Sequence, residues 1–453
     1  MVEAVDLLIE GPTILTMSEL GVIREGAIAI KGDRIVEVGR RDRILDSYRG
    51  EQVIDGRGYI AMPGLIDCHT HTFQVLLRGS LSLKEFSKHP VWLNVLIPFE
   101  GALTEKEARI SAQLSCLNMI KMGTTCFADA GGPRPETLAK AVVESGLRAV
   151  ITRSTMDRGQ LPETMKDSTD EALVKNMSLI ERWNGSGDGR IKVWFGIRQI
   201  MTSTDELLHR TAELARKYNV GIHIHLSEEI LEVDHALRRW GERPVEHLAN
   251  IGLLSDKVLA AHCSYLTDHE VKILAEHRVS VAHCPVINYS YMYNPKIPQM
   301  LTSGVNVCMG TDGGSMRPLD MFQEAITALV CCNAHYGTPY YDHQALTLQD
   351  VLEMATTNGA KALMWNHEIG AIKPGYKADI ILIDTRRPHL TPLYDPYSIP
   401  LLCQGTDVTT VIVNGKTLMQ NGRVKTLNEE QIIEEARELV PTLIEKIENI
   451  AKK

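Results

Sequence analysis

The middle of the chain alternates two hydrophobic patterns between about residue 59 and residue 365. Short runs of β-branched and apolar residues are followed by longer stretches in which apolar positions recur at helical spacing. This alternation is typical of a parallel α/β architecture. Eight strand-like runs end near His71, Asp129, Arg153, Arg198, His225, His262, His283 and Asp312. Eight such runs favour a (β/α)8 barrel over an open sheet, and a barrel places its active site at the carboxyl ends of its strands.

The two ends of the chain have a different pattern, in which short strand-like runs are separated by turn signals. Residues 1–58 contain four such runs. Similar runs return at 378–383 and 408–413, and the hairpin signal Asn414-Gly415 follows the second of these. Because a segment as short as residues 1–58 is too small to enclose a core alone, we expect the two ends to fold together.

These patterns predict three parts of the molecule. Residues 1–58 and 366–427 form one discontinuous β-sandwich domain, and residues 59–365 form the (β/α)8 catalytic barrel inserted between them. Residues 428–453 have the apolar spacing of an amphipathic helix with acidic residues in its first turn. Pro441 is expected to kink or restart that helix, because proline cannot donate the backbone hydrogen bond.

Composition and charge narrow the class of protein. A chain of 453 residues, 44% hydrophobic and 23% charged, can form one large domain and a smaller one. Its net charge of -9 is spread along the sequence without a basic block, which argues against nucleic acid and anionic membranes as partners. No apolar run approaches the ~18 residues that span a bilayer, and the first residues lack the basic region of a signal peptide. We therefore expect a globular cytoplasmic protein with a small-molecule substrate.

The nine cysteines are odd in number and include no CxxC pair. Many lie inside apolar runs, which indicates buried free thiols in a reducing compartment. The HxE and PCxxC signature of the zinc deaminases that act on cytidine or tRNA adenine is absent, and this excludes one competing fold.

Candidate metal-site and proton-transfer groups follow several of the predicted barrel strands. His69 and His71 lie on the same side of one extended segment, because side chains alternate along a strand. Further groups of this type follow later strand-like runs: His225, Glu228, His262 and Asp312. Any one of these histidines alone is more often a surface residue or a hydrogen-bonded core residue than a ligand. Their order, each at a strand end, indicates a metal site.

The same residues lie in motifs that resemble the amidohydrolase superfamily, in particular its mononuclear-metal aminohydrolases. That branch includes S-adenosylhomocysteine and methylthioadenosine deaminases, guanine deaminase and s-triazine hydrolases. The motifs are PGLIDCHTH at 63–71, HIHLSE at 223–228, AHC at 261–263, HCPVIN at 283–288, GTDGG at 310–314 and KPGYKADIILID at 373–384. The ordered set covers most of the chain and is far more specific than any one motif.

The resemblance implies that one divalent metal is bound by His69, His71, His225 and Asp312, with His262 beside the metal's water. Zinc is the first choice of metal, with iron, nickel or cobalt as alternatives for the same N/O ligands. Zinc lowers the pKa of a bound water to about 7, so that hydroxide is available at neutral pH. The binuclear branch uses a carbamylated lysine at the end of the fourth strand, whereas Lys192 lies at the start of that strand here. A single metal is therefore favoured.

Three side chains are expected to carry out the proton transfers. Glu228 follows His225 by three residues, so it lies on the loop after the strand and turns back over the site. There it would move a proton from the attacking water to a ring nitrogen and then to the leaving amine. Asp312 would take the second proton, and His262 would orient the hydroxide or the departing group.

Four residues are candidates for binding the substrate: Glu100, Arg198, His262 and Trp92. Glu100 matches a glutamate that contacts ribose in the nucleoside deaminases, but an acidic residue at this place is equally typical of a helix start. Trp92 either lines the pocket or packs in the core. Arg198 stands where a histidine is usual in the family. It either donates two hydrogen bonds to a ring carbonyl or forms a salt bridge to a barrel carboxylate.

Other polar residues near these motifs have open or structural interpretations. Tyr289, Tyr291 and Tyr293 alternate along the chain, and they either offer a stacking surface for a flat ring or pack beneath the loop. His223 shares a strand face with His225 one layer deeper, and we expect it to be structural. For His283 the structural interpretation is also preferred over a contact with substrate.

Three functional hypotheses follow from this sequence. The first is a metal-dependent hydrolytic deaminase that releases ammonia from an amino-substituted nitrogen heterocycle, with purine derivatives of the S-adenosylhomocysteine, methylthioadenosine or adenosine type as the leading class. The second keeps this chemistry but changes the substrate, to an s-triazine that loses chloride or an alkylamine, or to an oxo-purine or pterin. The third is a catalytically inactive barrel that acts as a binding module. By analogy with relatives, a homo-oligomer is also expected.

Overall fold

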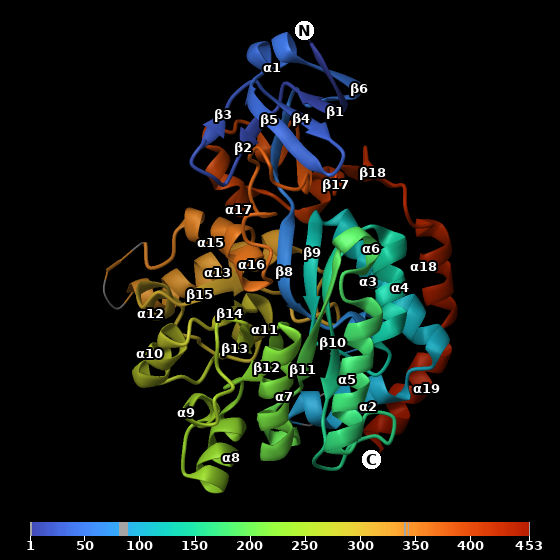
Figure 1. The fold of residues 1–453 in the computed structure, drawn as a ribbon, viewed down its shortest axis with the longest axis vertical. Coiled ribbons are helices and arrows are strands. Elements are labelled where there is room, and N and C mark those ends of the chain that lie inside the picture. The colour runs from blue at the N-terminus through green and yellow to red at the C-terminus, as the bar shows by residue number, and fades with distance from the viewer. Residues whose placement is uncertain (1, 81–88, 339–340, 343, 453) are drawn as a thin grey trace.

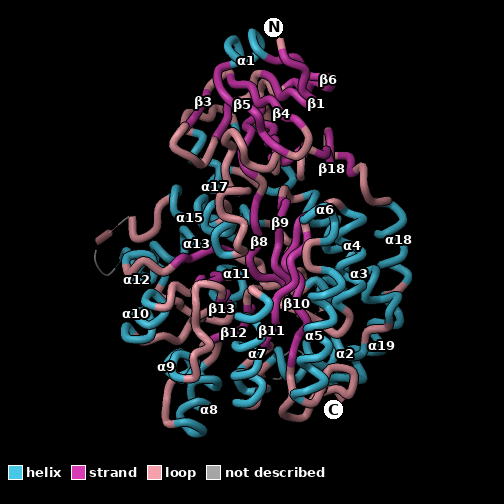
Figure 2. The backbone as a smooth tube through the Cα atoms, viewed as in Figure 1, coloured by secondary structure: helices cyan, strands magenta, loops and turns pink. Residues whose placement is uncertain are grey.

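The computed structural model describes residues 2–80, 89–338, 341–342 and 344–452 (Figures 1 and 2). Its centre is a sheet of eight parallel strands in the order β15-β14-β13-β12-β11-β10-β9-β8, so each strand lies beside its neighbours in sequence. The strands are β8 (Leu65–Thr70), β9 (Thr124–Asp129), β10 (Arg148–Thr155), β11 (Ile191–Ile197), β12 (Ile222–Leu226), β13 (Val258–His262), β14 (Ser280–His283) and β15 (Asn306–Met309). All eight predicted strands are present, and the (β/α)8 fold class is confirmed.

The first and last strands meet at their carboxyl ends, where the sheet curls into a barrel. The backbone N–H of Asp312, just after β15, donates to the carbonyl of His69 in β8 at 2.8 Å. Gly310 permits this approach, because a Cβ at this position would lie 2.8 Å from Cβ of His69. The barrel closure therefore brings the residues that follow the last strand against the metal-binding motif of the first.

Helices surround the barrel on its outside (Figure 1). The longer ones are α3 (Glu105–Lys121), α4 (Pro135–Ser145), α5 (Thr169–Trp183), α7 (Asp205–Tyr218), α8 (Ile230–Trp240), α10 (Asp268–Glu276) and α13 (Met321–Cys332). Shorter ones are α2 (Ile97–Ala102), α6 (Ser186–Gly189), α9 (Pro244–Asn250), α11 (Pro285–Ser290), α12 (Ile297–Thr302), α15 (Leu348–Met354) and α16 (Thr357–Ala362). None of the helices in the described part of the chain is long and apolar enough to cross a bilayer.

Local sequence explains where several of these helices begin. In α3, the Thr104 hydroxyl accepts from the Glu107 backbone N–H, and the Glu107 carboxylate accepts in return from the Thr104 backbone. The same reciprocal cap starts α5, α10 and α15, with Ser or Thr at the cap and an acidic residue three positions later. Each cap satisfies backbone donors that the first helical turn leaves without a partner.

The two chain ends form two further sheets at one end of the barrel (Figure 1). The first contains β1 (Glu3–Glu10), β4 (Gly26–Lys31), β5 (Arg34–Arg40) and β6 (Tyr48–Asp55), and α1 (Arg41–Ser47) connects the last two. The second joins both ends of the chain, with β2 (Thr13–Leu15), β3 (Val22–Ile23) and β7 (Tyr59–Pro63) beside β16 (Ile380–Asp384), β17 (Val408–Val413), β18 (Lys416–Gln420) and β19 (Arg423–Val424). The central pairing is antiparallel, between β7 and β16.

A buried ion pair connects this second sheet to the barrel. Arg148, at the start of β10, donates from Nε and Nη2 to the two carboxylate oxygens of Asp379 at 3.0 and 3.2 Å. Both side chains are 1% exposed, and Arg148 also donates to Asn414 in the β17–β18 turn. The pair therefore ties the amino end of a barrel strand to the residues that flank β16 and β17.

The chain ends in two helices rather than one. α18 (Glu429–Glu438) and α19 (Val440–Ala451) are separated at Leu439, and Pro441 lies in the first turn of the second helix. The restart at Pro441 is as predicted, because a proline in the first turn does not interrupt any hydrogen bond of its own helix. α18 packs along α3 on the outside of the barrel (Figure 2).

Candidate functional site

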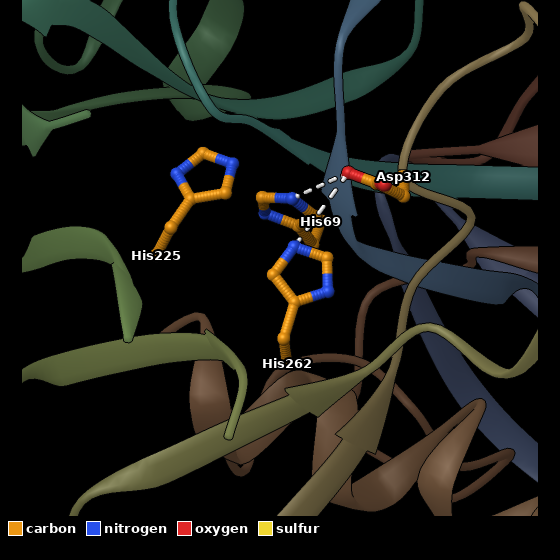
Figure 3. Close-up of side chains that lie close together, drawn as sticks. All are labelled: His69, His225, His262 and Asp312. Atoms are coloured by element: carbon orange, nitrogen blue, oxygen red, sulfur yellow. Dashed lines mark hydrogen bonds and ion pairs between the residues drawn. The ribbon is translucent and has the colours of Figure 1, made fainter. Parts of the chain in front are cut away.

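The predicted metal-site residues converge at the carboxyl ends of four barrel strands. His69 lies in β8 and His71 directly follows it, His225 lies in β12 and His262 ends β13. Asp312 lies in the loop after β15. One side-chain ligand atom from each of His69, His225, His262 and Asp312 lies within 4.8 Å of those of the other three (Figure 3).

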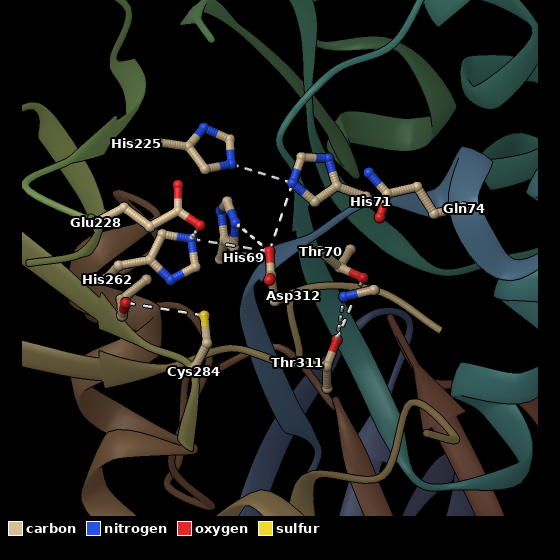
Figure 4. A network of polar contacts seen from close by, with 12 residues as sticks. His69, Thr70, His71, Gln74, His225, Glu228, His262, Cys284, Thr311 and Asp312 are labelled. Atoms are coloured by element: carbon tan, nitrogen blue, oxygen red, sulfur yellow. Dashed lines mark hydrogen bonds and ion pairs between the residues drawn. The ribbon is translucent and has the colours of Figure 1, made fainter. Parts of the chain in front are cut away.

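The fifth group, His71, faces the same point. Its Nε2 lies 3.1 Å from Nε2 of His225 and 3.5 Å from Oδ1 of Asp312, while Nε2 of His69 lies 2.9 Å from the same carboxylate oxygen (Figure 4). The tightest group of four thus contains His262, which we predicted beside the metal, and lacks His71, which we predicted as a ligand. His71 lies directly next to this group.

The chemistry of these donors fits a divalent transition metal. Burial lowers the pKa of His69, His71 and His225, so all three imidazoles are neutral and offer a lone pair at neutral pH. Nε2 of His71 and Nε2 of His225 lie 3.1 Å apart, so both nitrogens face the same point. Three neutral imidazoles and one carboxylate form an N/O set that zinc binds with an open position for water.

The strand ends that carry the site have unusual backbone conformations. Ser227, His262, Cys263 and Asp312 all have positive φ angles, of 50°, 71°, 49° and 58°. Non-glycine residues in this left-handed region carry a cost in free energy, which the surrounding packing must offset, and they concentrate at functional sites. The backbone therefore turns sharply at the points where it delivers Glu228, His262 and Asp312 to the site.

Glu228 and His262 stand together beside Asp312. Oε1 of Glu228 lies 3.8 Å from Nε2 of His262, which is 3.9 Å from Oδ1 of Asp312. Burial raises the pKa of Glu228, and the charge of Asp312 raises it further. Burial lowers the pKa of His262, but the carboxylates of Glu228 and Asp312 outweigh burial and raise it. The site thus places a carboxyl with a raised pKa beside a histidine with a raised pKa.

Residues behind the site hold these groups, and the sequence analysis did not identify several of them. Asp67 accepts from the Thr311 hydroxyl at 2.6 Å and from its backbone N–H at 3.0 Å, which fixes the loop before Asp312. Asn288 accepts at 3.0 Å from Nδ1 of His262 and contacts His283 at 3.3 Å. His283 therefore has a structural role, because it contacts Asn288, which in turn holds the ring of His262. The HCPVIN motif contained both residues, but only the fold shows that they face His262.

Glu232 anchors the loop that carries Glu228. Its fully buried carboxyl accepts from the backbone N–H of Glu228 at 2.9 Å and from Nε2 of Gln199 at 3.1 Å. Its other oxygen is buried without a partner among the described residues. Burial raises the pKa of Glu232 to about 8, so this carboxyl is largely protonated at neutral pH. The sequence offered only a helical glutamate four residues after Glu228.

Arg198 and Glu100 form a buried ion pair. Nη1 of Arg198 donates to Oε2 of Glu100 at 2.9 Å and to Oε1 at 3.3 Å, and both side chains are at most 2% exposed. Gln74 donates to Oε1 of the same carboxylate at 2.6 Å. Of the two alternatives for Arg198, the salt bridge to a barrel carboxylate forms, and Glu100 is its partner. Glu100 also lies in the first turn of α2, so the helix-start position occurs as well, although this side chain forms no cap hydrogen bond.

A hollow opens beside the metal-site residues. Its lining includes the carboxylates of Glu228 and Asp312 and the apolar side chains of Trp92 and Leu96. A smaller hollow next to it is lined by Arg198, His71 and His225 as well as by Trp92. Trp92 therefore lines the pocket, although it is 7% exposed and also packs in the core.

The three tyrosines separate into two groups. Tyr291 and Tyr293 line the larger hollow and stack on each other, with ring centroids 5.8 Å apart at 25°. Tyr289 lies in α11 and packs edge-on against His283, with ring centroids 5.8 Å apart. Both predicted alternatives thus occur, because a helix occupies the first part of the loop and the strict alternation of an extended segment is lost.

Comparison with known proteins agrees with the motifs and the site described above. Residues 60–418 match the model of the Amidohydrolase family. A 5-methylthioadenosine/S-adenosylhomocysteine deaminase of Moorella thermoacetica is 40% identical over 434 residues, which cover 94% of this chain and 97% of that protein. A 5'-deoxyadenosine deaminase of Methanosarcina acetivorans is 38% identical and covers 97% of this chain and 98% of its own length.

Among solved structures, an adenosine deaminase from Xanthomonas campestris with bound zinc superimposes with a TM-score of 0.90 at 27% identity. The superposition covers 98% of this chain and 99% of the other. The match therefore extends over the barrel and the sheets formed by the chain ends alike.

Proposed function

The chain belongs to the amidohydrolase family, and from this premise we propose that it is a metal-dependent hydrolytic deaminase of a 6-aminopurine nucleoside derivative. It replaces the exocyclic amine with oxygen and releases ammonia. The observation that carries this proposal is the convergence of His69, His71, His225 and Asp312 on one point, with Glu228 and His262 beside it. The relatives named above, at 38–40% identity over nearly the whole chain, favour the adenosine, thioether-adenosine and 5'-deoxyadenosine class.

The ligand set of the proposal is His69, His71, His225 and Asp312, with one divalent metal, zinc by preference. When bound, such a metal lowers the pKa of a coordinated water toward 7. The backbone helps to position these ligands, because the left-handed turn at Asp312 directs its carboxylate back toward His69 in β8.

Glu228 is the proton carrier in this proposal. Its buried carboxylate takes a proton from the attacking water and delivers it to a ring nitrogen, and a second transfer protonates the leaving amine. The raised pKa of Glu228 suits this task, since a carboxyl that gives and receives the same proton works best near the operating pH. Asp312 accepts the second proton of the water, and this is the proton that leaves with the ammonia. His262 orients the attacking oxygen, with its ring fixed by Asn288 at 3.0 Å.

Four residues are proposed to contact or arrange the substrate: Trp92, Arg198, His262 and Glu100. Trp92 offers a flat apolar wall for the heterocycle, and Arg198 presents a fixed cation next to His71 and His225. Glu100 is fully buried with its oxygens engaged by Arg198 and Gln74. Its proposed role is therefore to orient those two donors.

The test is ammonia release by metal-loaded protein. The panel contains adenosine, 5'-deoxyadenosine, methylthioadenosine, S-adenosylhomocysteine, guanine, a pterin, cytosine and an amino-triazine. We expect turnover of the adenosine derivatives and none by Glu228→Gln, which keeps the shape of the side chain but cannot carry the proton. Release from the triazine or pterin alone would replace the substrate class. Silence across the panel, from protein that holds about one equivalent of metal, would reject ring deamination of these compounds.

We also propose a cytoplasmic location, a compartment in which the nine unpaired thiols stay reduced. The exposed apolar side chains of α19, Val440 and Ile444, are 48% and 52% exposed and are our proposed contact between copies of the chain.

A further inference from the structure

His223 contacts His69 on the side that faces away from the other metal-site residues. Its Nε2 lies 2.8 Å from Nδ1 of His69, whereas Nε2 of His69 lies 2.9 Å from Oδ1 of Asp312. Both rings are buried, at 2% and 0% exposed. Two neutral imidazoles at this distance share one proton, so one nitrogen donates and the other accepts.

Only one of the two proton arrangements leaves His69 able to bind a metal. If His69 carries its proton on Nδ1, it donates to His223, and the lone pair on Nε2 faces Asp312 and the other ligands. If His223 donates from Nε2 instead, the proton of His69 must sit on its own Nε2 and blocks that lone pair. The tautomer of His223 therefore decides whether His69 is a donor to the metal.

The surroundings of His223 favour the productive arrangement. The backbone carbonyl of Asp129 lies close to this histidine and attracts a ring N–H. Nε2 of His223 is already engaged with His69, so Nδ1 is the nitrogen left for that proton. Nδ1 is buried and forms no hydrogen bond within the usual limits to any described residue. With its proton on Nδ1, His223 offers Nε2 as an acceptor.

We propose that His223 is a positioning residue that fixes the Nδ1–H tautomer of His69 and so prepares Nε2 of His69 for the metal. The inference rests on the metal site of the proposed function. It gives His223 a more specific role than the structural one predicted from the sequence. Groups that accept the second N–H of a metal-binding histidine typically contribute ~10–100-fold to metal affinity.

Two substitutions separate the acceptor from the packing. His223→Phe keeps a flat ring and removes the acceptor, whereas His223→Gln keeps an oxygen that can accept from His69. Metal-free protein is titrated with Zn²⁺ in competition with a chromogenic chelator. We expect the affinity for Zn²⁺ to fall ~10–100-fold in His223→Phe and to stay close to that of the unmodified chain in His223→Gln.

A matched control is His247→Phe. His247 is a buried histidine in α9 that stacks on Trp240 and lies outside the metal site, so its replacement should leave Zn²⁺ affinity unchanged. Thermal unfolding of all metal-free proteins reports how much each substitution disturbs packing. Unchanged affinity in His223→Phe would overturn the inference. The inference would also be overturned if the Phe and Gln variants lost Zn²⁺ affinity equally and in step with their loss of thermal stability.

A second measurement needs no variant to fold. Nitrogen-15 NMR of the histidine rings in the zinc-loaded, unmodified chain distinguishes the two tautomers. We expect protons on Nδ1 of both His69 and His223, and a proton on Nε2 of His223 would overturn the inference. Failure of the proposed metal site is recognised separately, because the unmodified chain itself would then bind no Zn²⁺, and the inference would fall with it.

Discussion

Carboxyl groups at the mouth of the barrel and in the sheets of the chain ends have opposite environments. At the barrel mouth, burial raises the pKa of Glu228 and Asp312. In the end sheets, hydrogen bonds from neighbouring arginines lower the pKa of Asp55 and Asp384. Acidic side chains thus have a raised pKa in one region and a lowered pKa in the other. The reason is that burial disfavours the charged form, whereas an adjacent guanidinium favours it.

This difference concerns which region contains groups that are unfavourable in free energy. The barrel mouth combines buried carboxyls, neutral buried histidines and four left-handed residues, each of which is unfavourable by itself. The end sheets instead carry ion pairs at the surface, such as that of Asp55 with Arg57. Departures from local preference concentrate at functional sites, and the core around them must supply the stability.

The largest effect is expected at the barrel mouth, from Glu228→Gln. The amide cannot exchange a proton at neutral pH, so kcat should fall by at least ~10²-fold, toward the upper end of the ~10²–10⁴-fold range of acid–base catalysis. Metal content and thermal stability should change little, since the substitution is nearly isosteric. Steady-state kinetics and metal analysis check this, and a variant that keeps its kcat would remove Glu228 from the mechanism.

The next largest effect is expected between the two regions, at the buried pair of Arg148 and Asp379. Asp379→Ala leaves an unpaired guanidinium that is 1% exposed, which should lower the free energy of unfolding by about 3–5 kcal/mol. The Zn²⁺ affinity of the protein that remains folded should be unchanged. Urea unfolding measures the stability, and the control is Asp384→Asn, which alters a more exposed ion pair at the other end of β16. Equal small losses of unfolding free energy in both variants would mean that burying the pair of Arg148 and Asp379 adds no stability.

Glu232 tests the comparison of buried and exposed carboxyls through the pH dependence of stability. Its pKa is raised by burial to about 8, so the folded protein holds a proton that the unfolded chain loses near pH 4.5. Its contribution is therefore fully present below pH 4.5 and declines as pH rises to 8, by up to about 1.4 kcal/mol per pH unit. Relative to Glu232→Gln, the unmodified chain should lose stability across that window. Parallel stability curves from pH 5 to pH 8 would contradict a buried neutral carboxyl.

The smallest effect is expected in the end sheets, from Asp384→Asn. The side chain pairs with Arg386, which is 58% exposed, and exposed pairs contribute at most about 1 kcal/mol. Because the pKa of Asp384 is lowered by that arginine, the contribution is present above the unfolded value of about 4. It is lost only as pH falls through the lower folded value. Thermal unfolding at pH 7 and pH 3 measures it, and a large loss at pH 7 would show that this pair supports the sheet.

Local sequence was sufficient to predict the barrel strands and the histidines and carboxylates that follow them. Runs of β-branched residues mark the strands, and a histidine or carboxylate after a run must lie at the strand end, whatever the rest of the fold does. His69 and His71 are an example, because the two-residue period of a strand alone places them on one side. The capping residues of α3, α5, α10 and α15 are equally local.

Pairings between distant elements could not be predicted in the same way. Arg198 and Glu100 are 98 residues apart in sequence, and both side chains are at most 2% exposed, so their ion pair depends on how β11 and α2 pack. The sequence therefore left two interpretations of Arg198 open. The tyrosines are a smaller case, since the helix α11 replaced the extended segment whose alternation suggested one common surface.

The sequence by itself determined which chemical groups the site contains and the order in which they occur along the chain. Only the tertiary structure decided what each group faces: His223 behind His69, Asn288 beside His262 and Glu232 beneath the loop of Glu228. The physical reason is that secondary structure and strand ends follow from short-range patterns. Burial, proton position and hydrogen-bond partner are set by side chains that arrive from strands and helices far away in the chain.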